Sequence, residues 1–143
     1  MPHQIVEYSA NLEGVIDIDA LIKCVHEAAL ATGVFPLAGL RTRAARRDHY
    51  CIADGHPDNA FVHVLLRIRF GRSLADRERA ADSISQALFD FLSGISSERP
   101  LAISLDIQDI DPHTNRKMNN LREHLASRGS GNSGGNTGGK DTG

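Results

Sequence analysis

Hydrophobic and polar positions along this chain alternate between two patterns. One repeats every two residues, as in a strand, and the other has the spacing of a helix. Residues 3–8 predict a short strand at the start of the chain. Asp17 can cap the helix that follows, Gly33 can end it, and residues 40–44 predict a second strand. The apolar side of the helix is formed by Ile18, Leu21, Ile22, Val25, Ala28 and Ala29.

The same order repeats after a turn-rich stretch at residues 54–59. Residues 61–70 alternate and predict a third strand, and residues 101–107 predict a fourth. Between them, Ser73 with Asp76 resembles a capping box, and Gly94 can end the second helix. The third strand has Val62, Val64, Leu66, Ile68 and Phe70 on one face, and the helix stripe holds Ala80, Ile84, Ala87, Leu88, Phe91 and Leu92.

This layout is a duplicated β-α-β unit, with halves at about 2–55 and 58–115. A helix that joins two strands of one sheet at this length favours a parallel crossover. Two such halves predict an α+β fold, a four-stranded mixed sheet with two helices on one face. The other sheet face has no cover, which predicts that copies of the chain associate through it.

The last stretch of the chain differs in composition from the rest. Residues 127–143 are almost entirely Gly, Ser, Asn and Thr with scattered charge. Such a segment has little to bury and cannot offset its ordering entropy. We therefore expect one folded domain over 1–126 and a disordered tail over 127–143.

Composition narrows the class of protein. The net charge of −2 over 143 residues gives no overall attraction to nucleic acid or to anionic membranes. No run of about 20 apolar residues predicts a membrane span, and the first residues lack the pattern of a signal peptide. The two cysteines, Cys24 and Cys51, form no disulfide framework. These features predict a cytoplasmic protein with free thiols.

Pro2 directly follows the initiator methionine and is small enough for Met1 to be removed. Removal would expose a secondary amine, and an ordinary α-amino group has a pKa of about 7.7–8.0. Burial or neighbouring cations would lower that pKa further, toward the range that suits an acid–base catalyst. The alternative is that Pro2 is simply a common second residue, and its position alone does not decide between the two.

Arginines supply the candidate anion-binding groups. Arg72 precedes the predicted second helix, where a cation gains nothing from the helix dipole but an anion does. Its guanidinium can hold a carboxylate with two hydrogen bonds. Arg41 and Arg43 lie on one face of the second strand, while Arg46 and Arg47 fit a solvated edge. This basic patch on an acidic chain suits a substrate that carries several carboxylates.

A metal site and a cysteine nucleophile are poorly supported. The spacing of His49, His56 and His63 matches no zinc pattern, so no metal is predicted. His63 fits a packed or hydrogen-bonded residue within a strand. Cys24 has no base at a suitable spacing.

Several blocks of the sequence resemble a known family. They are residues 1–9, 31–43, 53–55, 61–63, 71–74 and 119–120, in the same order. On these residues the chain is similar, from Pro2 to about His124, to the 5-carboxymethyl-2-hydroxymuconate delta-isomerase family of the tautomerase superfamily.

The resemblance implies a tautomerase-like fold, a homotrimer with sites near subunit contacts, and a cofactor-free isomerase. It implies Pro2 as the acid–base group, Arg72 and Arg41 as carboxylate ligands with Arg43 second, and Phe61 as an apolar wall. The implied reaction is a 1,3 proton shift on a di- or tricarboxylate from homoprotocatechuate (4-hydroxyphenylacetate) degradation. Two alternatives remain: a decarboxylase or hydratase of the same superfamily, or a trimeric binding protein without activity.

Overall fold

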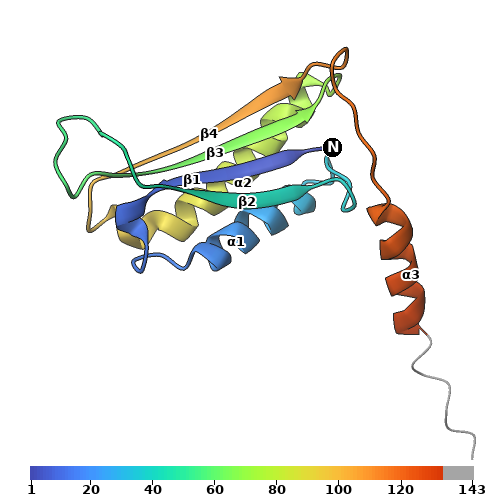
Figure 1. Ribbon diagram of the computed structural model, residues 1–143, viewed down its shortest axis with the longest axis horizontal. Coiled ribbons are helices and arrows are strands. Elements are labelled where there is room, and N and C mark those ends of the chain that lie inside the picture. Colours follow the sequence, from blue (N-terminus) through green and yellow to red (C-terminus); the bar gives the residue numbers. More distant parts are fainter. Residues whose placement is uncertain (134–143) are drawn as a thin grey trace, which may run out of the picture.

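A computed structural model describes residues 1–133 of the protein (Figure 1). It confirms the α+β class and the duplicated β-α-β order. The first half contains β1 (His3–Ser9), a short 3-10 turn (Ala10–Leu12), α1 (Ile18–Ala31) and β2 (Arg41–Arg47); the second contains β3 (Ala60–Arg69), α2 (Leu74–Ser96) and β4 (Leu101–Ile110); and α3 (Leu121–Ser133) follows.

The four strands form one mixed sheet in the order β2-β1-β3-β4. Within each half the two strands are parallel, and the halves meet where β1 and β3 run antiparallel. Both α1 and α2 lie against the same face of the sheet (Figure 1). This pairing places the beginning of β1 beside the beginning of β2 and the end of β3.

The core lies between the sheet and these two helices. Alternate residues of β1 and β3 and one stripe of each helix are buried, as the apolar periods predict. Burial of each such side chain stabilises the fold by about 1.5–3 kcal/mol. The fully buried members include Val6, Val64, Leu66, Leu21, Val25, Ile84 and Leu88.

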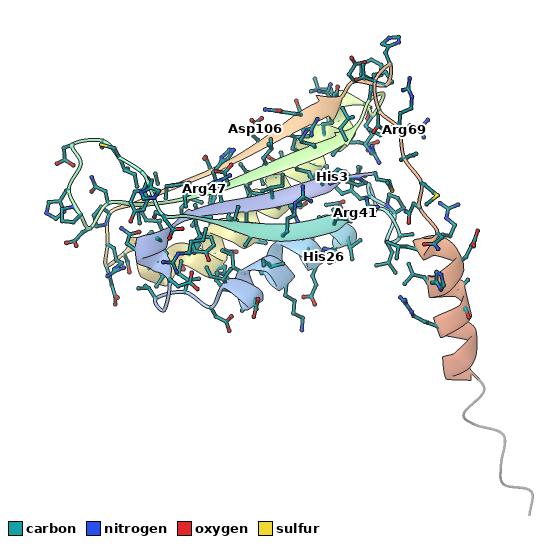
Figure 2. All side chains as sticks on the ribbon, viewed as in Figure 1. His3, His26, Arg41, Arg47, Arg69 and Asp106 are labelled. Carbon is teal, nitrogen blue, oxygen red and sulfur yellow. The ribbon has the colours of Figure 1, made fainter. Side chains whose placement is uncertain are left out.

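A buried polar contact joins α1 to the start of the sheet. Gln4 is fully buried and donates from Nε2 to the Thr42 hydroxyl at 3.1 Å. The same hydroxyl lies 2.7 Å from His26 Nδ1 on α1, whose side chain is labelled in Figure 2. Because the hydroxyl accepts from Gln4, its own proton is free to be donated to His26. This contact fixes β1 two residues after Pro2.

Both predicted helix starts are confirmed. Asp17 Oδ1 accepts from the Ala20 amide at 3.0 Å, and Ser73 Oγ accepts from the Asp76 amide at 3.1 Å. The predicted end at Gly94 is wrong, because α2 continues to Ser96. A glycine inside a helix costs only about 1 kcal/mol relative to alanine, which the packed stripe of α2 outweighs.

The placement of Phe70 on the buried face of β3 is also wrong. The strand ends at Arg69, and Phe70 is 61% exposed. Gly71 has φ +106°, a conformation that suits glycine, and the chain turns there toward α2. The turn carries Phe70 away from the core and brings Arg72 to the end of the sheet.

The sequence periods do not predict α3, which extends to Ser133. The first part of the segment 127–143, expected to be disordered, is therefore helical up to residue 133. The rest of that expectation, residues 134–143, lies outside the described residues. In Figure 1, α3 stands apart from the sheet, on the side where the chain begins. Within the described part of the chain, no helix combines the length and apolar character needed to cross a membrane.

Within residues 1–133, no helix or strand covers the sheet face opposite α1 and α2, as predicted (Figure 1). It carries polar pairs, including Arg47 Nε to Glu7 Oε2 at 2.9 Å. His63 Nδ1 lies 2.7 Å from the Ser104 hydroxyl, so His63 is hydrogen-bonded as predicted. This face is available in the single chain for contact with further copies.

Candidate active site

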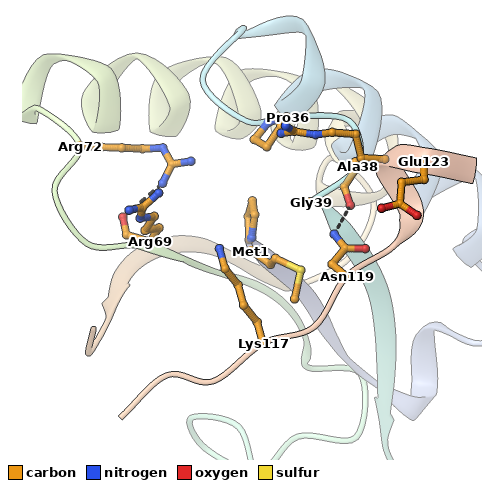
Figure 3. A pocket seen from close by; sticks show the side chains of 11 residues that line it. Met1, Pro36, Ala38, Gly39, Arg69, Arg72, Lys117, Asn119 and Glu123 are labelled. Carbon is orange, nitrogen blue, oxygen red and sulfur yellow. Dashed lines mark hydrogen bonds between the residues drawn. The ribbon is translucent and has the colours of Figure 1, made fainter. Parts of the chain in front are cut away.

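A pocket opens at the end of the sheet where β1 begins, with a volume of about 450 Å³ (Figure 3). That volume is within the range of small-molecule sites. Segments far apart in the sequence meet there. The pocket is lined by Met1, Pro2, Pro36, Ala38, Gly39, Arg69, Arg72, Lys117, Asn119, Arg122 and Glu123.

Pro2 is buried and held from two sides. Its carbonyl oxygen accepts a hydrogen bond from the Arg41 amide at 3.1 Å. The backbone of Gly39 passes so close that an added Cβ would lie 3.3 Å from Pro2 Cδ and 3.2 Å from Pro36 Cγ. The position of the Pro2 ring is therefore set by the turn between α1 and β2.

Arg72 is held in place by three contacts. Its guanidinium lies 5.2 Å from the centre of the buried Phe35 ring, a cation–π contact. Nε donates to the Val34 carbonyl at 3.4 Å and Nη1 to the Arg69 carbonyl at 3.2 Å. Burial, and next the charge of Arg69, lower the pKa of Arg72, although it remains a cation. A cation fixed in this way beside the start of α2 is well prepared to bind an anion.

The segment after β4 forms the remaining wall. Asn119 Nδ2 donates to the Ala38 carbonyl at 2.9 Å, which ties this segment to the turn beside Pro2 (Figure 3). Asn119 Oδ1 also accepts from the Leu121 amide at 2.9 Å, at the start of α3. Lys117 and Arg122, which flank Asn119 in the sequence, also line the pocket.

Cations dominate the electrostatics of the pocket. Burial lowers the pKa of the Met1 amino group, and Lys117, Arg41, Arg72 and Arg69 lower it further, in that order. Burial and like charges both disfavour the protonated amine. The start of the chain therefore lies in a region that favours anions and neutral amines.

The structure brings together only part of the predicted site. Pro2 and Arg72 line one pocket. Arg41 lies at its edge, where its guanidinium donates to the Gly39 carbonyl at 3.4 Å and to Met1 Sδ at 3.1 Å. In Figure 2, Arg41 and Arg69 lie toward the same end of the sheet. Arg43 is further along β2 and contacts His3 Nδ1 at 3.2 Å.

Phe61 lies at the opposite end of the sheet from Pro2. Its amide bonds to Ser9 Oγ at 3.0 Å, at the end of β1, and its ring packs edge-on against Tyr50. Within one chain, Phe61 is therefore no wall of the pocket that holds Pro2. Its assignment to the site remains a prediction that requires a second copy of the chain.

Sequence reasoning missed three cations of the pocket: Arg69, Lys117 and Arg122. Arg69 could have been found from strand pairing, because His3 pairs with Arg67. Arg69 is the next residue on the same face of that strand, beside Pro2. Lys117 and Arg122 follow β4 in a segment without hydrophobic periodicity, so the sequence gives no signal for them.

Known proteins resemble this chain in sequence and in fold. The family model of 5-carboxymethyl-2-hydroxymuconate isomerase matches residues 2–125. The chain belongs to this family. The predicted resemblance is thereby confirmed, and so is the expectation of an isomerase.

Members of the family and solved structures resemble the chain over most of its length. The 5-carboxymethyl-2-hydroxymuconate Delta-isomerase of Escherichia coli is 39% identical over 121 residues, which are 85% of this chain and 96% of that protein. A crystal structure of a 5-carboxymethyl-2-hydroxymuconate isomerase from Deinococcus radiodurans R1 has 32% identity and a TM-score of 0.81, covering 87% of this chain and 93% of that one.

More distant structures support the tautomerase-like fold alone. Native fused 4-OT superposes with a TM-score of 0.63 at 16% identity, over 87% of this chain and 98% of that one. A fused 4-OT described as a symmetric trimer gives 0.57 at 19% identity, over 82% of this chain and 92% of that one.

Proposed function

We propose that this isomerase converts 5-carboxymethyl-2-hydroxymuconate from its dienol to its conjugated keto form, with the amine of Pro2 as acid and base. The observation that carries this proposal is that buried Pro2 lines one pocket with Arg72 and three further cations. The relatives at 39% and 32% identity carry the name of this substrate.

The proposed chemistry needs a free nitrogen on Pro2. With Met1 attached, that nitrogen is an amide and cannot accept a proton. Removal of Met1 leaves a secondary amine one residue deeper than the amino group whose pKa is already lowered by burial and cations. The same surroundings would lower the pKa of the Pro2 amine, which favours its neutral, proton-accepting form.

Removal of Met1 would also free Arg41. The guanidinium of Arg41 donates to Met1 Sδ in the complete chain, and this contact disappears with the residue. Arg41 could then join Arg72 in binding the carboxylate beside the reacting oxygen. Processing of one residue thus creates the amine and releases a cation at its side.

In the reaction, the carboxylate next to the 2-hydroxyl binds at Arg72. The Pro2 amine accepts the hydroxyl proton, and the cations stabilise the negative charge that develops on that oxygen. The protonated amine then delivers a proton to carbon, so that one O–H bond breaks and one C–H bond forms. The electrons of the enolate oxygen form the new carbonyl, the diene supplies the electron pair of the new C–H bond, and no cofactor enters the step.

Assembly and location complete the proposal. The uncovered sheet face, and the trimer named for a fused 4-OT relative in fold, support a homotrimer. In such a trimer, Phe61 and Arg43 of one copy would lie close enough to contribute to the site of a neighbouring copy. A cytoplasmic location remains a prediction from the sequence.

The test is turnover of 5-carboxymethyl-2-hydroxymuconate, followed by ultraviolet absorbance. Wild type is compared with Pro2→Ala and with a chain that carries one extra residue before Pro2. We expect both changes to reduce kcat by at least about 10²-fold, the contribution of a positioned acid–base group. Full activity in both would exclude Pro2. Product analysis separates isomerisation from the decarboxylase and hydratase alternatives, and an intact Met1 in the purified protein would favour a binding protein.

A further inference from the structure

The pocket contains more positive charge than one carboxylate requires. Four cations line it, Arg69, Arg72, Lys117 and Arg122, against one carboxylate, Glu123. Within the described part of the chain, none of these four cations forms an ion pair. Like charges gathered without counter-charges repel one another, and this repulsion favours the binding of an anion among them.

These cations come from two separate parts of the fold. Arg69 and Arg72 belong to the turn between β3 and α2, whereas Lys117 belongs to the segment after β4. In Figure 3, Arg69 and Arg72 lie together on one side of Met1, and Lys117 reaches toward Met1 from another. A ligand with a second carboxylate can contact both the turn before α2 and the segment after β4.

Lys117 acts close to the reacting position. Among the charged groups, Lys117 lowers the pKa of the Met1 amino group the most, ahead of Arg41 and Arg72. Asn119, two residues later, ties this segment to the Ala38 carbonyl at 2.9 Å. Lys117 is thus carried by a segment anchored next to Pro2, and among the described residues no hydrogen bond or ion pair fixes its side chain.

We propose that Lys117 binds a second carboxylate of the substrate, apart from the one that Arg72 holds, and makes the site selective for polycarboxylates. This inference rests on the proposed function in one respect: the proposed function assigns the reacting end of the substrate to Arg72. An ammonium group binds a carboxylate as a point charge, so it tolerates variation in the position of that group. Arg72, held by three contacts, fixes the reacting end, and Lys117 adapts to the other.

Two non-reacting acids with the same diene test this proposal. trans,trans-Muconate carries a carboxylate at both ends, and sorbate carries one. Their binding to wild type, Lys117→Ala and Lys117→Arg is measured by calorimetry at low salt, where exposed charges are least screened. Lys23→Ala is the matched control, because Lys23 is an exposed lysine paired with Glu27 on α1.

We expect Lys117→Ala to weaken muconate binding by about 10-fold or more and sorbate binding by less than about 3-fold, in line with the loss of one charged contact. Lys117→Arg should retain the preference for muconate, and Lys23→Ala should match wild type. An equal loss for both acids, or no loss for muconate, would overturn the proposal.

The experiment is independent of turnover. If Pro2 variants keep full activity but muconate selectivity depends on Lys117, the proposed mechanism fails and this subsite stands. If turnover depends on Pro2 but Lys117→Ala leaves both acids unchanged, the mechanism stands and the subsite is wrong.

Discussion

Gly39 provides a sharp test of how the fold positions Pro2. In Gly39→Ala, the new Cβ would lie 3.3 Å from Pro2 Cδ and 3.2 Å from Pro36 Cγ. Carbon atoms pack best at about 3.5–4.0 Å, so one of the rings has to move by a few tenths of an ångström. Pro36 resists, because its carbonyl already accepts from the Gly39 and Leu40 amides at 3.0 and 3.3 Å. Pro2, near the start of the chain, is the freer of the two.

The effect on stability should be small. A glycine-to-alanine change in an allowed conformation gains about 0.4–1 kcal/mol from the unfolded chain, and crowding costs about 1–3 kcal/mol. The effect on kcat should be more pronounced than the effect on stability. A displacement of 1 Å at a reacting group can cost about 10²-fold, so a few tenths of an ångström should lower kcat by about 3- to 10-fold.

The assay measures kcat and thermal unfolding side by side for Gly39→Ala and Gly94→Ala. Gly94 is the control, since an added Cβ there meets no atom within 4 Å. We expect Gly94→Ala to keep full activity and to unfold at the same or a slightly higher temperature. Unchanged kcat in Gly39→Ala would refute the close packing of Pro2, and a large loss of stability would refute the reasoning on backbone tolerance.

Three further changes test other parts of the structure. Asn119→Ala removes the bond to the Ala38 carbonyl and should raise KM several-fold with little change in Tm, measured by steady-state kinetics and thermal melts. His3 is a neutral acceptor for Arg43, and burial, then Arg43, lower its pKa below the ordinary 6.5. Its contribution to stability is therefore complete above pH 6.5 and is lost as pH falls through the lowered pKa, so His3→Gln should flatten the dependence of Tm on pH in that acidic range. Leu66→Ala empties a fully buried position of β3 and should lower the free energy of unfolding by about 2–5 kcal/mol, measured with urea.

The fold could be predicted because its elements follow local rules. Alternation in β3, the apolar stripes of both helices and the caps at Asp17 and Ser73 each specify an element within a few residues. The errors occurred where a local rule was weak. Gly94 is tolerated inside a packed helix, and Phe70 lies just beyond the last paired residue of its strand.

The site could be predicted only in part, because it is assembled from distant segments. Pro2 and Arg72 have local signals, a chain start and a helix start. Lys117 and Arg122 have none, since their place depends on how the segment after β4 returns to the turn at Ala38. Phe61 was placed in the site by resemblance, and strand pairing shows it at the far end of β3 in the same chain.

The central claim is that the mature chain begins with a free Pro2 amine whose pKa is lowered by burial and neighbouring cations. Its most direct test is the intact mass of the purified protein together with a pH titration of the Pro2 nitrogen by 15N NMR. We predict a mass without Met1 and a Pro2 pKa below the ordinary value of about 7.7–8.0, raised in Lys117→Met. A retained Met1, or a nitrogen that titrates at or above the ordinary value, would contradict it.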